Sequence, residues 1–219
     1  MLGEEKMKVI DLSFNITGQQ IPADHAYSLY SSISRVLPHL HGCGEIGIHP
    51  ISGTPVGNRL ISLNPKSRLV FRVDDEKIRE ILPVAGKTLD LDGSKITVGV
   101  SSTALLIAYP RLYSRMVIIK GFMEPEPFLE AAARQLTELA IKGKAALVPQ
   151  PEIAEANKNR VSGSHSAYLR RTISIHGKQV VGFALTVSEL SAEESLTLQE
   201  KGVGGRRHFG CGIFIPDRR

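Results

Sequence analysis

Apolar and polar residues alternate near the start of the chain, and this alternation predicts a half-buried strand over residues 8–16. Ile10, Leu12 and Phe14 fall on one face of that strand, and mainly polar residues fall on the other. The pattern then changes to helical spacing, with Asp24 as the expected N-cap of a helix that runs to about Leu37, where Pro38 ends it. The chain therefore opens as strand followed by helix.

The same periodicities predict the rest of the fold. In the first half they indicate strand material at 46–51 and 60–73, a helix that begins near 74–76, and a hairpin over 89–100. In the second half they indicate a strand at 115–122, a helix from 127 to about 141, a polar loop over 142–167, a hairpin over 169–187, a helix after a capping box at 191–194 that ends at 202, and a strand at 213–215. Each half then has the order β-α-β-β-α-β. We predict an α+β protein made of two tandem ferredoxin-like (RRM-like) units, at 1–108 and 109–219.

Composition narrows the class of protein. The 219 residues are 42% hydrophobic and 22% charged, which is typical of a globular protein. The apolar runs are too short to cross a bilayer, the N-terminus lacks a signal-peptide pattern, and two cysteines do not make a disulfide framework. We expect a cytoplasmic protein with no membrane partner.

The positive charge is concentrated near the C-terminus. Residues 1–157 hold 17 Lys and Arg and 17 Asp and Glu, whereas residues 158–219 hold 10 and 5. A basic surface of this kind is typical of proteins that bind a phosphate-rich partner, although a solvated basic tail has the same composition.

A glycine-rich stretch favours the phosphate-binding interpretation. Its glycines follow the spacing G-x-G-x5-G-x-G, with one more inside it: Gly202, Gly204, Gly205, Gly210 and Gly212. Glycine allows positive φ and close backbone approach, and successive N–H groups can bind one phosphate. The stretch follows a predicted helix, precedes a strand and lacks a Gly-Lys-Ser/Thr ending, so it is neither a dinucleotide-binding turn nor a Walker loop.

Three side chains between the glycine pairs complete a predicted RNA-binding loop. Arg206 and Arg207 supply forked donors for phosphate oxygens or a guanine edge, and His208 adds a further contact. Other RNA-binding candidates are Arg170 and Arg171 in the second hairpin and Lys158 and Arg160 in the polar loop.

The glycine-rich stretch before a last apolar strand resembles the characteristic loop of the CRISPR-associated RAMP proteins. Within them the chain is similar to the repeat-processing endoribonucleases, the sixth CRISPR-associated protein family, and to the subgroup of a myxobacterial type I system. Matching segments run along the chain, at 22–25, 40–41, 47–50, 119–122, 126–128, 181–185, 190–196 and 204–207.

The resemblance implies a reaction and a partner. Members cut CRISPR precursor RNA within its repeats without a metal or other cofactor, by attack of a ribose 2′-OH on the adjacent phosphate. The products are a 2′,3′-cyclic phosphate and a 5′-OH. Repeat RNA, both precursor and mature guide, is then the expected partner, and further subunits of a CRISPR effector complex are candidate partners.

Proton transfer in such a reaction suits a histidine. The resemblance places the essential histidine in or just after the first helix, and His41 matches that position best. His25 has its own argument, because the positive end of the helix dipole would keep it neutral. His49 is a third candidate, and Tyr27, on the same predicted helix as His25, could orient or stabilise the reacting groups.

Two alternatives stay open. The chain could be a noncatalytic RNA-binding subunit of an effector complex, because such subunits share the fold and the loop. It could instead hold zinc, because His39, His41 and Cys43 lie close together and His49 would make a fourth ligand.

Overall fold

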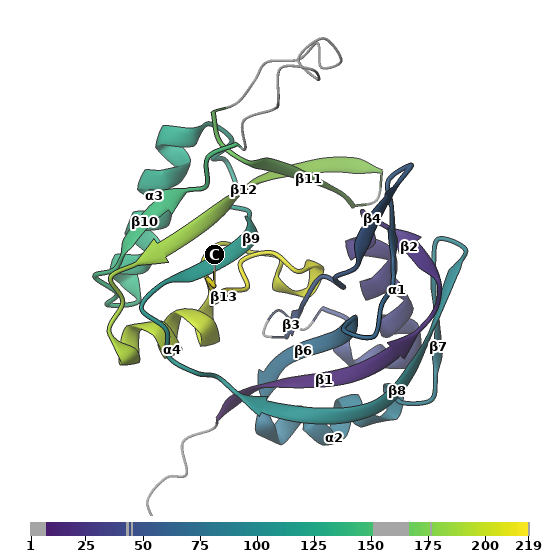
Figure 1. The fold of residues 1–219 in the computed structure, drawn as a ribbon. Helices are drawn as coiled ribbons and strands as arrows, with labels where there is room; N and C mark the ends of the chain where they lie inside the picture. The colour runs from purple at the N-terminus through teal and green to yellow at the C-terminus, as the bar shows by residue number, and fades with distance from the viewer. Residues whose placement is uncertain (1–7, 43, 45, 151–166, 176, 219) are drawn as a thin grey trace, which may run out of the picture. The chain divides into compact units, whose positions relative to one another are not determined.

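The computed structural model describes residues 8–42, 44, 46–150, 167–175 and 177–218. The chain divides into two compact units (Figure 1). The first unit comprises Met1–Ile107, Ile173–Lys178 and Arg206–Gly210. The second unit comprises Ala108–Thr172, Gln179–Gly205 and Cys211–Arg219. Part of the glycine-rich stretch, Arg206–Gly210, belongs to the first unit.

The first unit is built on a five-stranded antiparallel sheet (Figure 1). In spatial order its strands are β3 (Gly47–Ile48), β6 (Arg68–Asp74), β1 (Val9–Thr17), β8 (Ser94–Leu105) and β7 (Thr88–Leu91). Without β7, this is the ferredoxin-like order 2-3-1-4. The predicted alternation on β1 is confirmed, since Ile10, Leu12 and Phe14 are buried.

Short elements complete the first unit. They are β2 (Gln20–Pro22), β4 (Thr54–Gly57) and β5 (Leu60–Ser62) in a small sheet, the helices α1 (Ala26–Val36) and α2 (Ile78–Ile81), and 3₁₀ turns at Pro38–Leu40, Asp75–Lys77, Leu82–Val84 and Arg207–Phe209. The expectation that Asp24 caps α1 is wrong. The N-cap is His25 with no side-chain cap, and the carboxylate of Asp24 instead accepts a hydrogen bond from the Ser174 N–H at 3.0 Å.

The second unit repeats the ferredoxin-like arrangement. Its sheet has the order β10-β12-β9-β13, with β11 paired to β12. The elements are β9 (Leu112–Val117), α3 (Pro125–Glu138), β10 (Lys144–Leu147), β11 (Arg170–Ile175), β12 (Lys178–Ser188), α4 (Ala192–Lys201) and β13 (Ile215–Pro216). The prediction of two tandem ferredoxin-like units is confirmed.

Two strands of the second unit differ from their prediction. The first strand lies at Leu112–Val117 rather than 115–122. The other strand is β10, which lies at the end of the order β10-β12-β9-β13. Its residues fall within the segment that we predicted to be a polar loop. Its sequence Lys-Ala-Ala-Leu has no strand propensity of its own, and it is held as a strand by pairing with β12, from Lys144 opposite Ser188 to Leu147 opposite Leu185.

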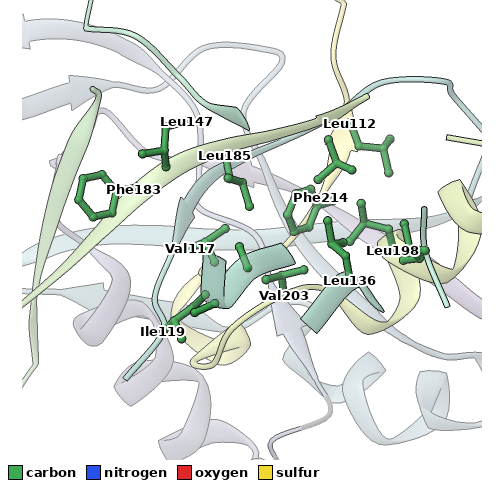
Figure 2. Close-up of a cluster of buried hydrophobic side chains, with 14 of the residues drawn as sticks. Leu112, Val117, Ile119, Leu136, Leu147, Phe183, Leu185, Leu198, Val203 and Phe214 are labelled. Carbon is green, nitrogen blue, oxygen red and sulfur yellow. The ribbon is translucent and has the colours of Figure 1, made fainter. Parts of the chain in front are cut away.

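The core of the second unit joins both helices to one face of the sheet (Figure 2). Leu136 of α3 and Leu198 of α4 meet Leu185 and Phe183 of β12 in one buried cluster. The capping box predicted for α4 is confirmed, with the Ser191 side chain accepting from the Glu194 N–H and the Glu194 carboxylate accepting from the Ser191 N–H. The helix ends where predicted, at the C-cap Gly202.

The glycines at the edges of the loop are needed for contacts within the protein. The Gly204 N–H donates to the Gln135 side-chain oxygen at 2.7 Å, and the Gly205 N–H donates to the Ile118 carbonyl at 2.9 Å. Gly204 has φ +76°, and a Cβ there would collide with the Ile118 carbonyl oxygen. Gly212 has φ +66°, and a Cβ there would collide with the Val203 carbonyl oxygen.

We predict that Gly204→Ala lowers the free energy of unfolding by about 2 to 4 kcal/mol, because it combines left-handed strain with a backbone clash. Gly205→Ala is the matched control, since a Cβ at Gly205 meets nothing within 4 Å. Its effect should stay within about 0.5 kcal/mol. Urea denaturation of both variants measures the difference, and equal stability of the two would contradict the packing role of Gly204.

Candidate active site

Phe209 fixes the centre of the glycine-rich stretch within the first unit. Its side chain is buried, with its ring centroid 5.1 Å from that of Tyr30 and 6.2 Å from that of Tyr27 on α1. Gly210, at φ +78°, lies so close to Pro50 that a Cβ would come within 2.7 Å of its ring. The 3₁₀ turn Arg207–Phe209 is therefore a packed element rather than a flexible connection.

This packing brings two histidines to the ring of one tyrosine. The His208 ring centroid lies 4.7 Å from that of Tyr30, and the His41 ring stacks on Tyr30 at 6.1 Å with an interplanar angle of 25°. The Tyr30 hydroxyl accepts a hydrogen bond from the Gly42 N–H at 2.9 Å, which holds the loop that carries His41. We call Tyr30, His41 and His208 the two-histidine cluster.

The members of this cluster differ in exposure. His41 is exposed, His208 is partly buried and the Tyr30 side chain is buried. Burial lowers the pKa of His208, and the neighbouring charges of Arg206 and His41 lower it further. His208 is therefore neutral near pH 7, with a ring nitrogen free of a proton and able to accept one.

His25 lies in a different environment. It is buried, its Nδ1 lies 2.8 Å from the Pro22 carbonyl oxygen, and its Nε2 accepts from the Ile51 N–H at 3.0 Å. Since Nε2 accepts, Nδ1 carries the proton and donates. Both ring nitrogens thus stabilise the backbone around α1, which favours a structural role for His25.

His49 follows β3 and belongs to a buried charge network. Its Nε2 lies 3.4 Å from Oδ1 of Asp11, and Arg72 donates to both oxygens of the same carboxylate at 2.8 and 2.9 Å. The Arg72 side chain is only 1% exposed. The bidentate pair is needed because an isolated buried guanidinium would be strongly destabilising.

Two pKa values in this network follow from burial and charge. Burial alone would raise the pKa of Asp11, but His49 and Arg72 outweigh it and hold that pKa well below its ordinary value. Burial lowers the pKa of His49 despite the nearby carboxylate of Asp11, and the charge of Arg72 lowers it further. His49 is therefore neutral at neutral pH.

The two arginines of the glycine-rich stretch differ in exposure. Arg206 is exposed and adopts the left-handed conformation, with φ +66°. Arg207 is partly buried; burial lowers its pKa to about 10, as does the charge of Arg72, while Asp74 and Asp11 act in the opposite direction. Arg206 is thus the better placed of the two to reach a ligand.

The other predicted residues are distributed over both units. Tyr27 lies on α1 beside Phe209, and Arg170 is exposed in the second unit, 5.9 Å from the Phe183 ring centre. Arg171 is partly buried. Gly202, Gly210 and Gly212 are buried, and Lys158 and Arg160 lie outside the described residues.

Tyr30 was not among the predicted site residues. Its ring is buried, and its hydroxyl also holds the loop that carries His41. His208 was predicted only as a further contact of the glycine-rich loop, and no local pattern in the sequence could bring it to Tyr30.

The described part of the chain contains no group of three or more His, Cys, Asp or Glu side chains that could hold a metal. The zinc alternative included Cys43, which lies outside that part. Among the helices of the described residues, none has the length and apolarity to span a membrane.

The chain is built of two ferredoxin-like units and carries arginine and histidine in its glycine-rich stretch, so it falls in the class of tandem ferredoxin-like proteins. Comparison with known proteins identifies its family within that class. A family model described as Cas6 Crispr matches residues 10–219. The CRISPR-associated endonuclease Cas6 of Myxococcus xanthus (strain DK1622) is 36% identical over 213 residues, which is 97% of this chain and 84% of that protein. The chain belongs to the Cas6 family.

Solved structures share the fold. One described as CRISPR associated protein Cas6 aligns with a TM-score of 0.63 and 9% identity, over 96% of this chain and 100% of its own. The product of a Cas6-related gene from Pyrococcus furiosus aligns with a TM-score of 0.65 and 12% identity, over 96% and 99%. At such low identity these likenesses support the fold alone.

The depressed pKa of His49 predicts a pH-dependent stability. The unfolded chain binds a proton at this histidine near its ordinary pKa of 6.5, whereas the folded chain resists it. Stability is therefore present above pH 6.5 and lost as pH falls, by at most about 1.4 kcal/mol per pH unit for this one group. In the His49→Gln variant, the free energy of unfolding should fall less steeply as the pH is lowered from 7 to 5. Urea denaturation at each pH measures this slope. An unchanged slope would mean that His49 titrates normally in the folded protein.

Proposed function

We propose that the protein is a metal-independent endoribonuclease that binds CRISPR precursor RNA and cuts it within its repeats. The ribose 2′-OH attacks the adjacent phosphate and leaves a 2′,3′-cyclic phosphate and a 5′-OH. Membership of the Cas6 family and the name of the Myxococcus xanthus relative, an endonuclease, support the reaction class. Repeat RNA is the proposed partner.

The observation that carries the proposal is the position of His41. Its imidazole is exposed and stacks on a tyrosine whose hydroxyl holds the same loop. An exposed imidazole in a fixed position can exchange protons with a bound substrate near neutral pH. His25 and His49 are less suited, since the former uses both nitrogens for the backbone and the latter lies against Asp11.

Arg206 supports the RNA-binding part of the proposal. It is exposed two residues from His208, and it bears a charge that can pair with a phosphate. A phosphate held there would place the RNA backbone beside the two-histidine cluster. Arg170, Arg171, Lys158 and Arg160 remain proposed contacts along the rest of the strand.

We predict that the pure protein cuts repeat RNA in EDTA to a product that ends in a cyclic phosphate. His41→Ala should slow single-turnover cleavage by about 10²- to 10⁴-fold, because proton transfer is lost, and leave RNA affinity within a few-fold. His39→Ala, two residues before His41 in the 3₁₀ turn Pro38–Leu40, is the matched control and should cut like the unaltered protein. Tight binding without cutting would show a noncatalytic RNA-binding subunit instead.

A second prediction concerns the two loop arginines. Arg206→Ala should weaken repeat RNA binding by about tenfold and reduce the slope of log affinity against log salt by about 0.7 to 1, the value for one lost phosphate contact. Arg207→Ala should keep that slope and instead lower the unfolding midpoint. If only the Arg207 variant changes the slope, then Arg207, and not Arg206, is the RNA contact.

A further inference from the structure

His208 is a candidate for a second proton-transfer group in the proposed cleavage. Cleavage by a 2′-OH requires a base on one side of the phosphorus and an acid on the other, because the entering and leaving oxygens are in line. One histidine cannot occupy both positions in a single step. The two-histidine cluster contains a second imidazole beside the same tyrosine ring as His41.

We propose that His208 is the base and His41 the acid of this cleavage, an inference that rests on the proposed function. His208 takes the proton of the attacking 2′-OH as the bond from the 2′-oxygen to phosphorus forms. The bond from phosphorus to the 5′-oxygen breaks, and protonated His41 gives its proton to that oxygen. Exchange with water then restores both rings.

The backbone around His208 holds its ring in a defined position. The 3₁₀ turn Arg207–Phe209 is flanked by Arg206 and Gly210, which are both in the left-handed conformation. Phe209 anchors the turn on one side, and Gly210 against Pro50 fixes its end. A group held by packing on both sides keeps its geometry without ordering during the reaction.

The environment of His208 also suits a base. Its ring is partly buried and neutral at pH 7, because burial and the charges of Arg206 and His41 lower its pKa. The proximity of Arg206 has a further consequence. The cation that disfavours a proton on His208 is also able to stabilise the negative charge that develops on the phosphate.

The experiment compares His208→Ala and His41→Ala on repeat RNA with oxygen or sulfur at the 5′ leaving position. A thiolate leaves without a proton, so sulfur restores a variant that lacks the acid but not one that lacks the base. We expect His208→Ala to cut the oxygen substrate about 10²- to 10⁴-fold slower with affinity within a few-fold. With the sulfur substrate, the cleavage rate of His41→Ala should be restored, whereas that of His208→Ala should stay low. Added imidazole should partly restore the cleavage rate of His208→Ala.

Three results would overturn the assignment. They are full activity of His208→Ala, a loss of RNA affinity as large as the loss of rate, and restoration of His208→Ala by sulfur. Failure of the proposed function is distinguishable, since the unaltered protein would then not cut the oxygen substrate in EDTA.

Discussion

The burial of Phe209 against Tyr27 and Tyr30 is the contact on which the candidate site depends. It draws five residues from near the C-terminus, Arg206–Gly210, into the first unit. Without it, His208 and Arg206 would be carried by an open loop with many conformations. Burial of an aromatic ring contributes about 1.5 to 3 kcal/mol, which is enough to favour one conformation of a short turn strongly. Phe209, the apolar residue next to His208, therefore supplies the order that the candidate site needs.

The buried network of Asp11, Arg72 and His49 supports the same region from the sheet. Asp11 on β1 and Arg72 on β6 are direct partners in the strand register, so their pair spans two strands. Arg207 lies close enough for the charges of Asp74 and Asp11 to favour its charged form. A buried pair of this kind is poor evidence for added stability, because desolvation offsets its attraction. Its more direct effect is electrostatic, since the charges of Asp11 and Arg72 act on Arg207, the neighbour of His208.

Local patterns in the sequence were sufficient for most of the fold, since alternation on β1, the capping box of α4 and the glycine at its end are all short-range signals. They failed for β10, whose four residues are held by pairing with β12 rather than by propensity. The site was harder to predict. His41 was expected from the resemblance, but its proximity to His208 depends on tertiary packing between residues distant in sequence, which no periodicity encodes. His25 was a candidate because it lies at the start of a helix, but both of its ring nitrogens form hydrogen bonds with the backbone.

The structure indicates a packing role for the glycines of the glycine-rich stretch. The spacing suggested that glycine allows a phosphate to approach the backbone, but at Gly204, Gly210 and Gly212 the close approach is to the protein's own atoms. The glycines therefore shape the loop, and exposed Arg206 is left to meet a ligand. Because Arg206 and His208 share one packed turn, RNA binding and proton transfer need not be divided between separate regions of the chain. A phosphate held by Arg206 would be held within reach of the histidine whose pKa that same arginine lowers.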